Sequence, residues 1–163
     1  MEIYSGMETQ AIFEADEEKL YKLRVAARNI YGLSKWSEVL AIRAGAIPPE
    51  VSTIESTNIA NNRIEIMWEK PGKDEIEEYQ VNIFVKSKDM FEVVQALCDG
   101  SDPDVIKHRT CTLSSKVLNR DYGYHHGDLL IVKVRARNSL GWGAWSKPNT
   151  TGATVFKLVP LGG

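Results

Sequence analysis

Trp142 and Trp145 follow a segment in which three cationic residues, Lys133, Arg135 and Arg137, alternate with apolar ones. If this segment is a β-strand, the alternation places the three cations on one face. A guanidinium or ammonium group over an indole ring contributes about 0.5–1 kcal/mol at an exposed site. We therefore expect a ladder of stacked cations and rings. Stacked partners satisfy one another, so a structural role is the simpler interpretation, and ligand binding is the alternative.

Cys98 and Cys111 are the two cysteines of the chain. They flank an acidic turn, 99–104, and we expect them on neighbouring strands within bridging distance. A disulfide between them would close a loop of about fourteen residues and contribute about 3 kcal/mol. Two reduced thiols packed in the core are an equally good interpretation. Neither cysteine has a histidine at ligand spacing, so no zinc site is expected.

Asp99, Asp102 and Asp104 gather carboxylates in one turn. Their spacing fails the register of a calcium-binding EF-hand loop, and a solvated turn explains them better. His125 and His126 are adjacent in a loop, which favours an exposed pair. We find no catalytic constellation at motif spacing and no phosphate-binding loop, so we expect neither an enzyme nor a cofactor.

Asn149 begins the tripeptide Asn-Thr-Thr and is a candidate N-glycosylation site. The chain has 163 residues, 43% of them hydrophobic, and a formal net charge of −2. This balance excludes the basic field that nucleic acid requires. No apolar run approaches a membrane span, and the N-terminus lacks the apolar stretch of a signal peptide. We expect a chain that stays inside the cell or is cut from a longer protein.

The elements that would position these residues are strands. Arg63–Trp68 alternates, which directs Ile64, Ile66 and Trp68 inward, and 78–86 and 129–138 alternate in the same way. Trp68, Tyr79, Val132 and Val134 are therefore predicted core residues. Further strands are predicted at 51–56, 91–98, 107–113 and 145–155, the last with a break at Pro148.

The segment 21–29 recurs 109 residues later as 130–138, and each copy is followed by a glycine and a Trp-Ser pair. A repeat of this length indicates tandem copies of one small domain. We predict a partial unit at 1–46 with three strands (11–13, 20–29 and 39–43), a complete unit at 47–157 and a tail at 158–163. The partial unit leaves an apolar face open, so neighbouring repeats or another chain would complete it.

These patterns resemble the fibronectin type III family. Trp68 with Pro71 resembles the second strand of the family, and Tyr79-Gln-Val81 the third. Both copies of the repeat resemble the sixth strand. The resemblance implies an all-β, immunoglobulin-like β-sandwich, one unit complete and the preceding one represented by its C-terminal part. The family's corner tyrosine is present as Tyr21 but is Leu130 in the second copy, so we expect its hydroxyl bridge to be absent there.

Two further resemblances add detail. Trp142-Gly-Ala-Trp145-Ser146 is similar to the Trp-Ser-x-Trp-Ser box of cytokine receptor modules, with Gly143 in place of the first serine. Cys98, Cys111, 127–130 and 141–142 resemble a divergent repeat of large proteins of ciliated protists. The second resemblance implies a long multi-repeat surface or ciliary protein.

We interpret the chain as a non-catalytic structural or binding module of a larger multi-repeat protein, mediating protein–protein contacts or adhesion. The alternatives are a ciliary or cytoplasmic scaffold segment, or a non-catalytic accessory domain of a carbohydrate-active enzyme. Protein partners are expected, without nucleic acid or membrane insertion. A cell-surface or extracellular setting is favoured over a cilium or the cytoplasm.

Overall fold

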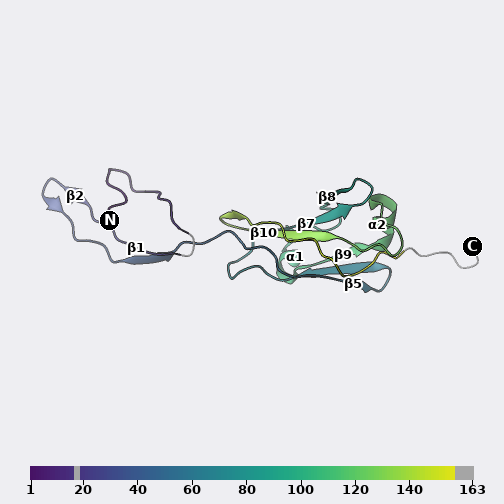
Figure 1. The fold of residues 1–163 in the computed structure, drawn as a ribbon. Helices are drawn as coiled ribbons and strands as arrows, with labels where there is room; N and C mark the ends of the chain where they lie inside the picture. The colour runs from purple at the N-terminus through teal and green to yellow at the C-terminus, as the bar shows by residue number, and fades with distance from the viewer. Residues whose placement is uncertain (17–18, 157–163) are drawn as a thin grey trace, which may run out of the picture. The chain divides into compact units, whose positions relative to one another are not determined.

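The computed structural model describes residues 1–16 and 19–156. The predicted tail at 158–163 lies outside the described residues. The chain divides into two units, Met1–Ala46 and a second that begins at Ile47. We call them the N-terminal unit and the C-terminal unit and describe each by itself (Figure 1).

The C-terminal unit contains two antiparallel sheets. One has the strand order β5–β6–β9 and the other β11–β10–β7–β8. The strands are β5 (Ile54–Ile59), β6 (Arg63–Trp68), β7 (Glu78–Val85), β8 (Met90–Val93), β9 (Thr110–Ser114), β10 (Val132–Asn138) and β11 (Gly141–Trp142). The expected all-β sandwich is confirmed.

The core lies between these sheets because β6, β7 and β10 each turn alternate residues inward. Trp68 packs edge-on against Tyr79, with the ring centroids 5.3 Å apart. Val132 and Val134 are buried in the same cluster and pair with Ile83 and Val81 of β7. The alternation predicted for these three strands is therefore correct, and all four predicted core residues lie in the core.

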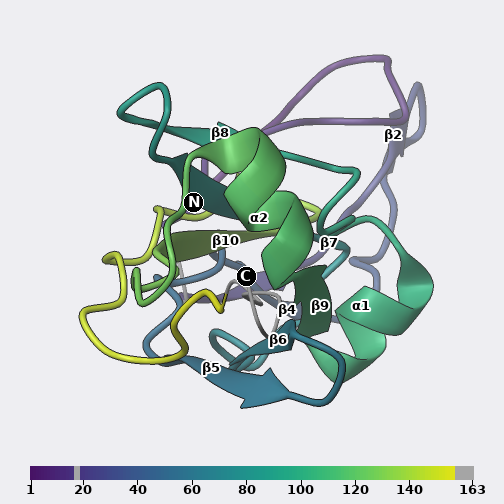
Figure 2. The same ribbon diagram turned by 90° about the vertical axis from the view of Figure 1, so that its right-hand side faces the viewer.

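Two short helices occupy segments where the sequence analysis predicted none. α1 (Pro103–His108) begins after Asp102, whose carboxylate accepts from the Asp104 N–H, and it has proline at its first position. α2 (Ser115–Tyr122) begins after Ser114 and ends at Gly123 in the left-handed conformation. These are ordinary helix-capping signals. Figure 2 shows α2 beside β8 and β9.

Several predicted strand boundaries are wrong as a result. The strand predicted at 107–113 begins only at Thr110, because α1 occupies the residues before it. The strand predicted at 91–98 ends at Val93, where a turn follows. The first strand, predicted at 51–56, is shifted to Ile54–Ile59, and the strand predicted at 129–138 begins at Val132.

The strand predicted at 145–155 is not a regular strand in the structure. It is tied to β10 through two backbone bonds, from Ser146 N–H to Val134 O (2.9 Å) and from Asn149 N–H to Val132 O (3.4 Å). Further along, Thr154 forms an isolated bridge with Leu129. Pro148 lies between the two residues that make these bonds and has no N–H to donate, so it interrupts the backbone pairing with β10.

The N-terminal unit contains β1 (Leu20–Leu23), β2 (Arg28–Asn29), β3 (Gly32–Leu33) and β4 (Leu40–Arg43). β1 pairs with β4 and β2 with β3, both antiparallel. The strand predicted at 11–13 is absent from the described residues, and the one predicted at 20–29 is divided into β1 and β2. Among the described residues of this unit, no hydrophobic side chain is buried.

Candidate functional site

The cation–ring ladder lies on the outward side of β10. The Arg135 guanidinium carbon is 4.6 Å from the ring centroid of Trp142 and 4.5 Å from that of Trp145. Arg137 lies 5.8 Å from Trp142, and the Lys133 ammonium lies 5.4 Å from Trp145. The two rings and three cations therefore interleave, with Arg135 between the two indoles. We call these five residues the ladder.

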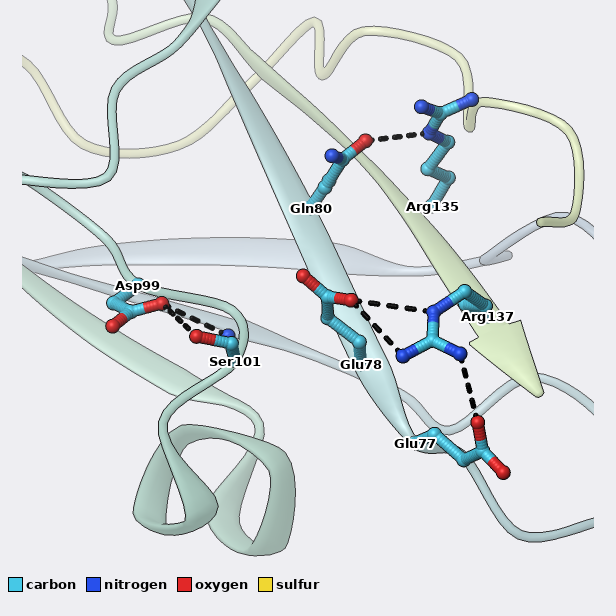
Figure 3. A network of polar contacts seen from close by, with 7 residues as sticks. All are labelled: Glu77, Glu78, Gln80, Asp99, Ser101, Arg135 and Arg137. Carbon is cyan, nitrogen blue, oxygen red and sulfur yellow. Dashed lines mark hydrogen bonds and ion pairs between the residues drawn. The ribbon is translucent and has the colours of Figure 1, made fainter. Parts of the chain in front are cut away.

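The ladder arginines are also held by polar side chains of β7 and its entry (Figure 3). Arg135 Nε donates to Gln80 Oε1 at 2.8 Å. Arg137 donates through Nε and Nη2 to Glu78 Oε2, both at 3.2 Å, and through Nη1 to Glu77 Oε2 at 2.8 Å. A guanidinium with fixed donors keeps its plane aligned, so these bonds orient the stacking.

The structure extends this surface by residues that the sequence analysis missed. The Lys133 ammonium also lies 4.5 Å from the ring of Phe91 on β8. Phe91 in turn packs edge-on against Phe84, with centroids 5.2 Å apart. The outward positions of β7 were visible from its alternation. A strand starting at Phe91 was also predicted, but its register with β7, which brings Phe91 opposite Phe84, was not.

Ser146 closes the hairpin after the ladder. Its Oγ accepts from the Val134 N–H at 2.8 Å, while its own N–H donates to Val134 O. At Gly143, where the cytokine receptor box has serine, a Cβ would overlap the carbonyl oxygen of Pro48. The close approach of the Pro48 backbone therefore explains the glycine.

The hairpin of the N-terminal unit repeats these bonds at the same 109-residue offset. Ser37 N–H donates to Val25 O, and Ser37 Oγ accepts from the Val25 N–H at 2.9 Å. The Arg24 guanidinium lies 4.4 Å from the Trp36 ring, as Lys133 lies over Trp145. Position 26 is alanine where the ladder has Arg135, so the N-terminal ladder has one rung.

Cys98 and Cys111 form a disulfide with their Cα atoms 5.6 Å apart. The expectation that they lie on neighbouring strands is wrong. Cys111 belongs to β9, whereas Cys98 follows a turn, and Gly100 O just after it accepts from the Tyr79 N–H on β7. The disulfide thus joins one sheet to a segment that runs beside the other.

The acidic turn is organised by its own side chains. Asp99 accepts from both the hydroxyl and the N–H of Ser101, and these bonds hold the pKa of its carboxyl below the usual value (Figure 3). Asp102 caps α1. Within the described residues, no group of three acidic, histidine or cysteine side chains could hold a metal ion.

Asn149 is half-buried and its amide is fully engaged. Oδ1 accepts from the Val132 N–H at 2.8 Å, and Nδ2 donates to Leu130 O at 2.8 Å and to Thr151 O at 3.0 Å. A glycan on Nδ2 would remove one of these two donors.

Tyr124 supplies the hydroxyl bridge that was not expected in this unit. Its hydroxyl donates to Phe84 O at 2.7 Å and accepts from the Ile131 N–H at 3.4 Å. Burial raises its pKa to about 12. In the N-terminal unit Tyr21 plays a comparable part, since its hydroxyl accepts from the Asp16 N–H.

A three-stranded sheet therefore faces a four-stranded one, with Trp68 between them and a tyrosine hydroxyl bridging the backbone before the sixth strand. This is the arrangement of immunoglobulin-like sandwiches. The C-terminal unit has a fibronectin type III-like fold. No helix among the described residues is long and apolar enough to cross a membrane.

Neither the protein-family models nor the curated proteins yield a match to this chain. Among solved structures, the chain is similar to the FN1–FN3 domains of chicken CNTN1 at 20% identity and a TM-score of 0.48, covering 82% of this chain and 42% of that one. A structure described as a myokine matches at 14% identity (TM-score 0.46, 66% of this chain, 98% of that one). A mutant of FN3tt matches at 12% identity (TM-score 0.43, 66% and 100%).

Proposed function

We propose that this chain is a non-catalytic structural and protein-binding segment of a larger protein built from β-sandwich repeats. The observation that carries the proposal is the recurrence in two units of one hairpin closed by the same pair of serine–valine bonds. Tandem copies of one unit act by spacing and by presenting repeated surfaces. Neighbouring repeats or another chain complete the N-terminal unit.

The two ends of the C-terminal unit are held side by side, which suits a segment that carries tension. Ala153 N–H donates to Ser56 Oγ at 2.8 Å, and Asn58 Nδ2 donates to Thr154 O at 2.7 Å. Lys147 N–H donates to Glu50 Oε1 nearer the start. Residues 50, 56 and 58 of the first segment contact residues 147, 153 and 154 of the last one in the same order, so the two segments run parallel. Pulling on the two ends loads these bonds together, in shear.

The setting we propose is extracellular or at the cell surface, where the multi-repeat protein takes part in adhesion. The disulfide supports this setting, because disulfides persist in oxidising compartments. A ciliary or cytoplasmic scaffold, or an accessory domain of a carbohydrate-active enzyme, remains the alternative. Purification from the native source, with the free thiols counted before and after reduction, separates the oxidising setting from the reducing ones.

Single-molecule pulling of the whole chain from its termini tests the structural role. We expect a cooperative force peak for the C-terminal unit. Reductant should increase the chain length released at this peak, because the disulfide otherwise keeps the loop that it closes from extending. Asn58→Ala should lower the unfolding force. Thr57→Ala is the matched control, because Thr57 is exposed on the same strand. Extension without a force peak, or equal forces for the two variants, would contradict the proposal.

A further inference from the structure

β10 of the C-terminal unit is paired along both edges. One edge binds β11 and the segment around Ser146, and the other binds β7, with Val134 opposite Val81 and Ala136 opposite Tyr79. In the N-terminal unit the first edge of the corresponding segment, 22–28, is filled by Ser34 and Ser37. Along the part of the chain that the structure describes, no strand pairs with its second edge.

The backbone groups on that second edge can be identified from β10. Phe84 N–H donates to Ile131 O at 2.9 Å, and Glu77 N–H donates to Arg137 O at 2.8 Å. Alternate residues from Ile131, just before β10, to Arg137 thus face β7. The corresponding residues in the N-terminal unit are Lys22, Arg24, Ala26 and Arg28. An unpaired row of N–H and C=O groups of this kind is a template for an added strand.

The exposed apolar side chains of the N-terminal unit also indicate a missing strand. Val25 is 69% exposed, whereas Val134, its counterpart, is fully buried against the opposing sheet. Leu40 and Ile42, which pair with Leu23 and Tyr21 on the same face as Val25, are also exposed. An incoming strand must therefore carry apolar residues at alternate positions on the Val25 side, as β7 does with Tyr79, Val81 and Ile83.

Charge sets one further requirement. Lys22, Arg24 and Arg28 place three cations along the edge. The counterpart of Arg28 is Arg137, which binds Glu77 and Glu78 at the start of β7. A strand seated in the same register brings its carboxylates to Arg28.

We infer that the 22–28 edge is a binding site for an antiparallel β-strand of a partner sandwich segment, apolar at alternate positions and acidic opposite Arg28. The inference rests on the proposed function, because it takes the second repeat as the template for the first. The partner strand thus has the pattern of β7, with apolar residues at alternate positions and a carboxylate at its start.

The test uses the whole chain and a synthetic peptide with the sequence of residues 76–86. Residue-resolved amide hydrogen exchange reports the pairing. We expect exchange at the Arg24 and Ala26 amides, whose counterparts pair with β7, to slow at least tenfold with the peptide, while the β10 amides stay unchanged. A peptide with Glu78→Lys should bind about fivefold more weakly, since it sets a cation against Arg28. A scrambled peptide should give no protection.

Two variants of the chain sharpen the result. Ala26→Pro removes an edge N–H and should abolish protection, whereas Ala26→Val keeps the N–H and should retain it. Equal protection in both variants, or none in wild type, overturns the inference. A chain that sediments as a dimer, with these amides protected without peptide, also overturns it, because the occupant is then a second copy. If the pulling experiment showed no force peak but the peptide still protected these amides, the result would contradict the proposed function and leave this inference standing.

Discussion

Val25 and Val134 occupy the same position in two hairpins, and a serine twelve residues further along closes each. The valine N–H donates to the serine Oγ at 2.9 Å in one unit and at 2.8 Å in the other. Val25 is nevertheless exposed and Val134 buried. Local sequence is sufficient to form the hairpin, whereas burial of its inner face requires the opposing sheet.

Trp68→Ala should destabilise the C-terminal unit by about 3–5 kcal/mol, because it removes a buried aromatic side chain from between the sheets. Denaturant unfolding followed by far-ultraviolet circular dichroism measures this. Trp36→Ala is the control: that ring is 51% exposed, and the same transition should move by less than about 0.5 kcal/mol. A loss below about 1 kcal/mol for Trp68→Ala would place the residue outside the core.

Arg135→Ala should cost about 1–2 kcal/mol, since it removes two ring contacts and the hydrogen bond to Gln80. Arg120→Ala, which removes an exposed pair with Asp121, should leave the free energy of unfolding unchanged. Indole fluorescence should change for the first variant alone. Equal free energies of unfolding for the two variants would show that the ladder adds nothing to stability.

Replacing both cysteines, Cys98→Ser with Cys111→Ser, should lower the free energy of unfolding by about 3 kcal/mol through the entropy of the opened loop. Reductant should shift the unfolding midpoint of wild type and leave that of the double variant unchanged. A wild-type midpoint insensitive to reductant would contradict this expectation.

Tyr124→Phe should destabilise the C-terminal unit by about 1–2 kcal/mol at neutral pH, because Phe84 O and Ile131 N–H lose their partner. Burial raises the pKa of Tyr124 from 10 to about 12 in the folded state, so the native state holds the proton more tightly. The corresponding stability is present below pH 10 and is lost as the pH rises toward about 12. Wild-type stability should therefore fall more steeply than that of the variant over this range. Parallel pH profiles would exclude Tyr124 as the cause.

Gly143→Ala should destabilise by about 1–3 kcal/mol, because its Cβ meets the Pro48 carbonyl. Ala144→Ser, at the exposed neighbouring position, should be close to neutral. Thermal unfolding compares the two. An unchanged transition in Gly143→Ala would mean that Pro48 moves aside without cost.

Alternation along β6, β7 and β10 predicted their inward faces correctly, since successive side chains of a strand point to opposite sides whatever the rest of the fold does. The same argument placed Lys133, Arg135 and Arg137 on one outward face. Stacking with Trp142 and Trp145 then needs no more than the adjacent hairpin, which is local in sequence.

Long-range placement was beyond this reasoning. Tyr124 bridges Phe84 and Ile131, and Gly143 makes room for Pro48. Cys98 and Cys111 lie within bridging distance as expected, but Cys98 lies outside the strands rather than on a neighbour of β9. The sequence by itself determined the inward faces of β6, β7 and β10 and the repeated hairpin, because these follow from neighbouring residues. The tertiary structure decided which backbone oxygen each distant side chain meets and which valine is buried, because those outcomes depend on segments brought together by the packing of the two sheets.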